Sequence, residues 1–487
     1  MYHPTLEEFR ALRNQGNLAP IYREIVADLD TPVSAFLKVN RGGYSFLLES
    51  VEGGEHVAHY SFIGTEPYRV ISTREGDRAD PLHLIAEELD KHKLVPVSGL
   101  PDFCGGAVGY LAYETVRRFE ELPSPDSDPL ALPESVFMFV DTLLIFDHVT
   151  HRIKIVSHAR PDGDVDSAYQ AAVRKIDVLV NRLEQPFEHC QPITTLDTPT
   201  EPAEISSNFT RDEFEANVEK ARQYIIAGEA IQIVLSQRLS RHTNAHPLNI
   251  YRALRGINPS PYMFFLDLKD FQIIGSSPEI LVRAVDGTVT TRPIAGTRPR
   301  GKSPAEDVQL EEELRSDEKE RAEHMMLVDL GRTEIGRVSV PGTVKVSELM
   351  KVERYSHVMH LVTNVEGRLR SDISPLDALR ACFPAGTVSG APKIRAMEII
   401  AGLEPDKRGP YAGCVGYFSF SGNIDTAITI RTIIMTNGIA HIQAGAGIIY
   451  ESVPEREYEE TLNKAQALLK AIEEAEALNT TSRGDNR

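Results

Sequence analysis

Short apolar strands joined by hairpin-sized links constrain the fold of this chain more than any other feature. Near the carboxyl end, residues 411–420, 424–435 and 439–444 are apolar runs separated by glycine-containing breaks of only a few residues. Links this short join antiparallel strands, because a parallel crossover needs a dozen or more residues. The sequence therefore predicts antiparallel sheet in this region.

The same alternation of apolar and polar residues recurs along the chain, interrupted by segments of helical periodicity. Strands are predicted for residues 33–48, 57–76, 104–113, 135–158, 230–239, 262–268, 271–275, 280–285, 288–293 and 355–368. Helices are predicted for residues 81–93, 165–185, 210–228, 247–256, 305–331, 375–381, 392–401 and 455–476. Helices inserted between antiparallel strands favour an α+β fold of layered antiparallel β-sheets with helices packed outside, rather than a parallel doubly wound sheet.

A polar segment rich in Thr and Pro, residues 191–208, is the best candidate for a linker. It divides the chain into an amino-terminal domain, residues 1–190, and a second domain, residues 209–476. The last segment, residues 477–487, is mostly polar, and we expect it to be a disordered tail.

Charge and apolar content narrow the classes of function. The 487 residues carry a formal net charge of −19, with 71 acidic against 52 basic residues, which argues against a nucleic-acid partner. No apolar stretch approaches the roughly 18 residues of a membrane helix, and the amino terminus does not resemble a signal peptide. The four cysteines lack metal-binding spacing. We therefore expect a cytoplasmic protein without a membrane partner.

Two predicted helices carry pairs of carboxylates on one face. Glu320 and Glu323 are three residues apart, as are Glu457 and Glu460, with Lys464 one turn further along. Two such faces could hold a hard divalent cation, which prefers oxygen ligands. Both helices are rich in glutamate, however, so a solvated surface explains the same spacing.

Three other features each have either a functional or a purely structural explanation. A glycine-rich turn is predicted at residues 445–447, where backbone N–H groups could approach an anion; a tight turn is the simpler explanation. Arg431 lies within the apolar run 424–435, and its fork suits either a ligand carboxylate or Asp425. His360 is either a core histidine or a functional one.

An ordered series of motifs resembles the chorismate-utilising enzyme family between residues 210 and 470. The motifs are Ser277-Pro278-Glu279, PIAGTRPRG from Pro293, KERAEHMMLVDL from Lys319, ERYSHVMHLVTNVEG from Glu353, FPAGTVSGAPK from Phe383, RGPYAGCVGYFS from Arg408, the segment around Arg431, and QAGAGIIYESVPEREYEETLNKA from Gln443. The front part, with FLLESVEGG and HYSFIG, is similar to the amino-terminal domain of anthranilate synthase large subunits.

The resemblance implies a reaction in which chorismate and ammonia give anthranilate and pyruvate, with Mg²⁺ as cofactor. It implies metal ligands at Glu323 and Glu460, supported by Glu320 and Glu457. The implied substrate-binding residues are Gly296, Thr297, Tyr411, Arg431, Gly445, Ala446, Gly447 and Lys464. The implied catalytic residues are Glu279 as the acid for the departing 4-hydroxyl, His360 in pyruvate elimination, Thr297 and Gln232.

Two positions distinguish the reactions of the family. Isochorismate and salicylate synthases carry a water-activating lysine where this chain has Gln232, and a neutral amide cannot serve as that base. Aminodeoxychorismate synthases generally carry a lysine where this chain has Ala295. Both residues favour an anthranilate synthase large subunit. An aminodeoxychorismate synthase large subunit and a non-enzymatic tryptophan-sensing homologue stay open as alternatives.

The resemblance also predicts partners. The chain has no glutamine amidotransferase domain, so we expect a separate glutamine amidotransferase subunit to supply ammonia, within a hetero-oligomer. Ser50 and the Pro261-Tyr262-Met263 segment resemble the family's pocket for the inhibitor L-tryptophan, although a strand end and a proline turn explain them equally well. One departure from the family is Arg332-Thr333-Glu334, where Arg-Asn-Asp is common; it puts hydrogen bonding near the end of that helix in question.

Overall fold

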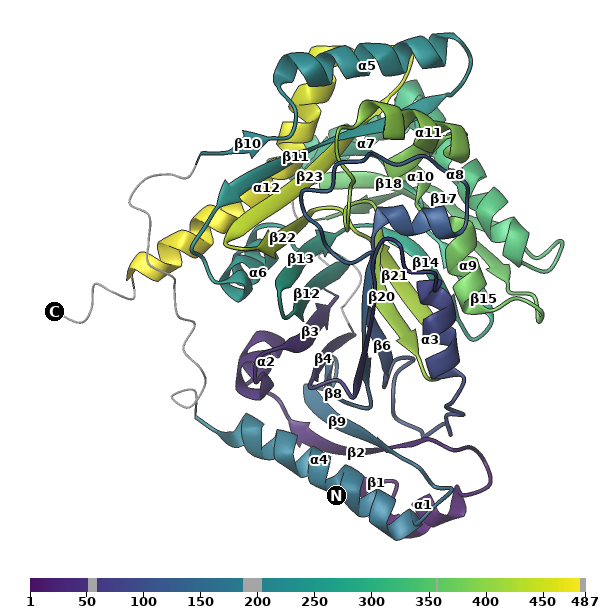
Figure 1. Cartoon of the computed structure of the whole chain (residues 1–487), viewed down its shortest axis with the longest axis vertical. Coiled ribbons are helices and arrows are strands. Elements are labelled where there is room, and N and C mark those ends of the chain that lie inside the picture. The colour runs from purple at the N-terminus through teal and green to yellow at the C-terminus, as the bar shows by residue number, and fades with distance from the viewer. Residues whose placement is uncertain (51–58, 187–203, 356–357, 482–487) are drawn as a thin grey trace.

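Two large antiparallel sheets form the centre of the molecule. The computed structural model describes residues 1–50, 59–186, 204–355 and 358–481. Within them the sheets contain thirteen and ten strands, and helices lie outside the sheets (Figure 1). The predicted α+β class with layered antiparallel sheets is confirmed. No helix in these ranges is both long and apolar enough to span a membrane.

The first sheet runs through strands from both ends of the chain. Its order is β1 (Tyr2–His3), β2 (Ala19–Val26), β9 (Arg152–Ala159), β8 (Thr142–Asp147), β4 (Tyr60–Thr65), β3 (Tyr44–Glu49), β12 (Tyr262–Leu268), β13 (Phe271–Ser277), β22 (Thr432–Thr436), β23 (Ile439–Ile448), β11 (Gln232–His242) and β10 (Ser206–Ser207). A short strand, β19 (Gly390–Ala391), also pairs with β11.

The second sheet is likewise built from both ends of the chain. Its order is β16 (Ile294–Pro299), β18 (Val358–Arg368), β15 (Thr288–Thr291), β14 (Ile280–Val285), β21 (Ile424–Ile428), β20 (Cys414–Ser419), β6 (Gly106–Leu111), β7 (Ser135–Val140) and β5 (Arg69–Thr73). Strand β17 (Lys345–Arg354), which the periodicity does not predict, pairs with β18. Because β3 pairs with β12 and β6 with β20, the sheets cross the predicted boundary between residues 1–190 and 209–476.

Alternation along the strands produces the layers. Phe264 of β12 belongs to the core between the two sheets, whereas the next residue, Phe265, packs against the helices outside the first sheet. Ile273 and Ile274 of β13 divide in the same way. A strand points successive side chains to opposite faces, so a run apolar at every position is buried on both sides.

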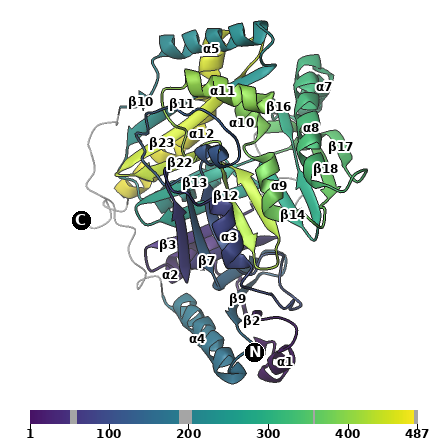
Figure 2. The same ribbon diagram turned by 45° about the vertical axis from the view of Figure 1, so that its right-hand side comes forward.

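Helices cover both outer faces. Those packed on the first sheet are α1 (Leu6–Ala11), α2 (Pro32–Val39), α4 (Val165–Glu184), α6 (Pro247–Ile257) and α12 (Pro454–Thr481), with α5 (Arg211–Ile226) and α11 (Lys393–Leu403) on β11 and β23. Those associated with the second sheet are α3 (Pro81–Leu89), the 3₁₀ helix η1 (Tyr113–Arg118), α7 (Pro304–Ser316), α8 (Glu318–Val338), α9 (Pro375–Cys382) and α10 (Gly386–Ser389). Figure 2 shows α7, α8 and α9 grouped on one side.

Two predicted elements were wrong because helix caps override the apolar pattern. The run 33–48 is a helix followed by a strand, since Thr31 and Ser34 form a capping box with Pro32 at the first helical position. The predicted helix 305–331 is two helices. Asp317 ends α7 and caps α8, where its side chain accepts hydrogen bonds from the N–H groups of Lys319 and Glu320.

Three predictions near the carboxyl end also need correction. The predicted strand 424–435 is two strands in different sheets, because the chain crosses between the sheets at residues 429–431. Strand β23 does not stop at residue 444 but continues to Ile448. Helix α12 continues to Thr481, so the segment predicted as a disordered tail begins as helix; the rest of that segment, and most of the predicted linker, lie outside the described residues.

Candidate active site

Lys464 of α12 connects the helix to β23 at the centre of the predicted site. Its Nζ donates a 2.8 Å hydrogen bond to the carbonyl of Gly445 and lies 2.7 Å from Glu460 Oε1. The backbone carbonyl of Lys464 accepts a 3.1 Å hydrogen bond from Arg431 Nη1. Three residues predicted for substrate or metal binding therefore meet around one lysine.

Arg431 lies where the chain passes from one sheet to the other. Its φ of 50° is in the left-handed region, as a sharp change of direction requires. Burial lowers the pKa of its guanidinium, while the neighbouring Tyr411 and Glu460 oppose that effect. The suggested pairing of Arg431 with Asp425 is wrong, because Asp425 accepts a hydrogen bond from Tyr262 instead.

Residues 445–447 are not a turn but part of β23, paired with β11. Glycine is needed at both ends of this segment for space. A Cβ on Gly445 would lie 2.8 Å from the Tyr411 hydroxyl, and one on Gly447 would lie 2.7 Å from Gln232 Nε2. Ala446 between them is fully buried. The glycines therefore bring a strand backbone close to two predicted site residues, which replaces the anion-binding turn that the sequence predicts.

The four predicted metal-site carboxylates come as two pairs from α8 and α12. Glu323 Oε1 accepts a 3.2 Å hydrogen bond from Gln232 Nε2. Burial and the adjacent Glu323 raise the pKa of Glu320, and burial together with Glu460 raises that of Glu457. Among the residues described, no three His, Cys, Asp or Glu side chains gather as a metal-binding group. The repulsion acts within each pair, and a hard cation bound to the carboxylates of either pair would relieve it.

Glu279 lies between β13 and β14 and is 7% exposed. Burial raises the pKa of its carboxyl to about 8, although the nearby Thr387 hydroxyl and Lys464 ammonium lower it. A buried carboxyl with this pKa remains protonated at neutral pH and can donate a proton. Its place beside Lys464 puts this acid next to the cationic part of the site.

His360 of β18 is held by the backbone of β16. Its Nδ1 donates a 2.8 Å hydrogen bond to the Gly296 carbonyl, and the Thr297 hydroxyl lies 3.1 Å from the same nitrogen. Because a carbonyl can only accept, the neutral ring carries its proton on Nδ1, and Nε2 has the lone pair of a base. Burial lowers the pKa of this imidazole, and Arg431 lowers it further.

A family model described as chorismate binding enzyme matches residues 43–470. The chain belongs to this family. Anthranilate synthase component 1 of Acetivibrio thermocellus is 50% identical, covering 98% of this chain and 99% of that protein. The same component of Aquifex aeolicus (strain VF5) is 47% identical, covering 97% and 98%. With these relatives the chain falls in the anthranilate synthase component 1 group of the family.

Solved structures agree with this grouping. The crystal structure of anthranilate synthase component I from Streptococcus pneumoniae TIGR4 superposes with a TM-score of 0.76 at 39% identity, covering 91% of this chain and 98% of that one. The menaquinone-specific isochorismate synthase from Escherichia coli superposes with a TM-score of 0.70 at 19% identity, covering 96% and 98%. The second likeness concerns the fold alone.

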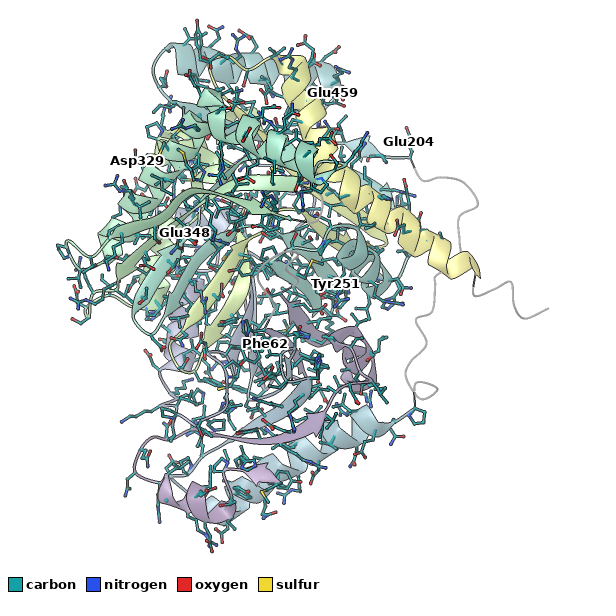
Figure 3. All side chains as sticks on the ribbon, turned by 180° about the vertical axis from the view of Figure 1, so that it is seen from behind. Phe62, Glu204, Tyr251, Asp329, Glu348 and Glu459 are labelled. Carbon is teal, nitrogen blue, oxygen red and sulfur yellow. The ribbon has the colours of Figure 1, made fainter. Side chains whose placement is uncertain are left out.

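The residues predicted to form the inhibitor pocket of this family line one cavity of about 1140 Å³ between the two sheets. Ser50, Pro261, Tyr262 and Met263 all contribute to its wall. Phe62, labelled in Figure 3, lines it as well. The structure thus brings together two segments that are far apart in sequence.

Two groups of functional residues were missed by the sequence reasoning. Arg408 is 1% exposed and forms two hydrogen bonds with Glu404, of 2.8 and 2.7 Å, while its guanidinium lies 5.7 Å from the centre of the Tyr411 ring. Glu49, next to Ser50, is 4% exposed and lines the cavity between the sheets. Charged residues directly beside recognised motif residues were the signal that could have found both.

Proposed function

We propose that the protein is the chorismate-using subunit of an anthranilate synthase, converting chorismate and ammonia to anthranilate and pyruvate. The observation that carries the proposal is the buried acid Glu279 near the ammonium of Lys464, whose backbone carbonyl accepts a hydrogen bond from Arg431, in a chain 50% identical to a protein of that name. Chorismate is a dianion, so local cations must oppose the net charge of −19.

Arg431 and Tyr411 would bind the enolpyruvyl carboxylate. A guanidinium binds a carboxylate through paired hydrogen bonds, and a tyrosine hydroxyl can donate a further one. The burial of both residues strengthens these bonds, because the surrounding dielectric is low. Lys464, Gly296, Thr297 and the β23 backbone at Gly445 would complete the walls around the ring.

Glu279 and His360 would divide the proton transfers. Glu279 would protonate the departing 4-hydroxyl while ammonia adds to the ring at carbon 2. His360, through Nε2, would then accept the ring proton as pyruvate leaves and the ring becomes aromatic. The hydrogen bond from Nδ1 to Gly296 orients the imidazole for this role.

Glu323 and Glu460 would hold Mg²⁺, with Glu320 and Glu457 supporting them. When bound, the ion supplies positive charge that neutralises the ring carboxylate of the substrate. The raised pKa values of Glu320 and Glu457 support this assignment, since a bound cation would relieve the repulsion of each by the neighbouring carboxylate on the same helix. Gln232, which donates to Glu323, orients a ligand rather than activating water.

Ammonia would come from a glutamine amidotransferase subunit, in a hetero-oligomer with this chain. The cavity between the sheets would bind L-tryptophan as a feedback inhibitor. Glu49 Oε2 accepts hydrogen bonds from Tyr251 (2.5 Å) and Arg255 (3.1 Å), whereas its Oε1 is buried without a hydrogen-bond partner among the described residues. An unpartnered carboxylate oxygen at the cavity wall suits the ammonium group of an amino acid.

One assay tests the proposed reaction. The purified chain is supplied with chorismate, Mg²⁺ and ammonium salts at alkaline pH, and anthranilate fluorescence and pyruvate are both followed. We expect the two products in equal amounts. Aminodeoxychorismate without pyruvate would assign the chain to the aminodeoxychorismate synthases. No product, with tryptophan still bound, would favour the sensing homologue.

A further inference from the structure

A small cavity of about 30 Å³ is lined by Glu279. Glu279, Thr387 and Glu334 line it together with Thr291, and the other lining residues are apolar or glycine, among them Leu327 and Leu330 of α8. Figure 2 shows α8, α9 and α10 together beside β14. Two carboxyl groups, distant in sequence, therefore line the same small cavity.

The Thr387 hydroxyl lies near the Glu279 carboxyl and lowers its pKa. Thr387 Oγ1 is buried and has no hydrogen-bond partner in the part of the chain that the structure describes. Glu334, on α8, is 7% exposed and lies 2.5 Å from Lys393 Nζ. Lys393 in turn donates to the carbonyl of Cys382 at 3.1 Å.

Water fits this space by size and by chemistry. A buried water needs roughly 10–15 Å³ of such volume and two to four polar partners, so the cavity has room for about two water molecules. Glu279, Thr387 and Glu334 supply three partners. A chain of water from one carboxyl group to the other is therefore sterically and chemically reasonable.

We propose that Glu334, paired with Lys393, relays protons to Glu279 through water in this cavity. The proposal rests on the proposed role of Glu279 as the acid. After Glu279 has given its proton to the departing hydroxyl, the carboxylate takes a proton from the cavity water, and that water takes one from the Glu334–Lys393 pair. Lys393, whose side chain is 14% exposed, then recovers a proton from solvent. The added ammonia releases one proton to solvent as it becomes an amine, so the protons balance.

The charges that face the pair are compatible with this role. Burial raises the pKa of Glu334, while Lys393 and Arg337 lower it. Cys382 of α9 also faces the pair, and burial raises the pKa of its thiol, which keeps it neutral. Glu279 faces Thr387 and Lys464. Burial and the two neighbouring cations therefore act in opposite directions on the proton affinity of Glu334.

The test is Glu334→Gln, which keeps the shape and removes the exchangeable proton. We expect kcat to fall about tenfold, less than the 10²–10⁴ typical of losing a direct acid. KM for chorismate stays within about twofold. The solvent deuterium isotope effect on kcat rises, and imidazolium buffer restores part of the rate. Glu318→Gln, exposed on the same helix, is the matched control.

Thr387→Val is a second variant, which leaves the Glu334–Lys393 pair intact and removes one partner of the water. It should show the same slow, buffer-sensitive turnover. An unchanged kcat in Glu334→Gln, or a loss that buffer does not restore in either variant, would overturn the relay. If the unmodified chain makes anthranilate but Glu279→Gln remains fully active, the acid assignment itself has failed, and the two outcomes are distinguishable.

Discussion

The hydroxyl of Tyr262 donates a 3.0 Å hydrogen bond to the carboxyl of Asp425, joining β12 of the first sheet to β21 of the second. Both residues line the large cavity. Strand β21 pairs with β14, and the N–H of Ile428 at the end of β21 donates a hydrogen bond to the carbonyl of Glu279. One strand therefore connects the wall of the proposed inhibitor cavity with the proposed acid.

Tyr262→Phe should weaken feedback inhibition. It removes a buried hydrogen bond that holds the Tyr262 ring and the Asp425 carboxyl in the wall that a ligand would contact. We expect the tryptophan concentration for half-inhibition to rise by up to about tenfold, which corresponds to about 1.4 kcal/mol of binding free energy. The measurement is the rate as a function of tryptophan concentration, with Tyr450→Phe, at an exposed residue, as the control variant. Identical curves for the two variants would remove Tyr262 from the pocket.

Glu279→Gln should lower kcat by about 10²–10⁴, as expected when a general acid is removed. In the unmodified protein the acid form is needed, and burial raises the pKa of this carboxyl to about 8. The rate should therefore be constant below that pH and fall above it. The measurement is kcat against pH at a fixed concentration of free ammonia, because ammonia itself titrates in this range. A rate that keeps rising well above pH 8 would contradict the assignment.

Glu323→Gln should abolish most magnesium-dependent turnover. The change replaces a carboxylate by a neutral amide at a proposed ligand position, and it also alters the acceptor of the Gln232 hydrogen bond. Mutating a residue that only hydrogen-bonds to a metal ligand already costs about 10–100-fold in metal affinity. The Mg²⁺ concentration that gives the half-maximal rate should therefore rise by at least that factor. The measurement is the rate as a function of Mg²⁺ concentration, with Glu318→Gln as the control variant. Superimposable curves for the two variants would exclude Glu323 as a metal ligand.

Arg408→Lys should destabilise the fold and raise KM for chorismate. Arg408 pairs with Glu404 through two hydrogen bonds, donates to the carbonyls of Val234 and Val388, and lies over Tyr411. Lysine keeps the charge but cannot reproduce the planar fork. We expect about 2–4 kcal/mol less unfolding free energy in urea, by analogy with disrupted buried ion pairs. Arg395→Lys, at a side chain that is 41% exposed, provides the comparison. Equal losses of unfolding free energy in the two variants would argue against a special role for Arg408.

Stability should fall as pH rises from about 4.5 to about 7. Burial raises the pKa of the Glu114 carboxyl from 4.5 to about 7, although backbone N–H groups of Arg408 and Gly409 lower it. A raised pKa means that the folded state binds the proton more tightly, so its stabilisation is complete below about pH 4.5 and is lost by about pH 7. Glu114→Gln should flatten the dependence of unfolding free energy on pH. The exposed Glu120→Gln should leave the slope unchanged.

Some site features could be read from local sequence, and others could not. The carboxylate spacing on α8 and α12 follows from helical geometry and needs no partner element. The segment 445–447 looked like a turn because glycine is permissive, whereas in the fold its glycines leave room for Tyr411 and Gln232. That reason lies in side chains from other strands, which no local pattern reports.

Sequence by itself determined the antiparallel α+β character, the positions of most helices, and a set of residues typical of chorismate-using enzymes, because periodicity, caps and motif order are properties of neighbouring residues. Tertiary structure decided which residues meet. It joined the two predicted domains in both sheets, gave Arg431 the carbonyl of Lys464 in place of Asp425, and put Glu334 in the same cavity as Glu279. These contacts depend on how distant strands and helices pack, and packing is decided by the whole core rather than by any one segment.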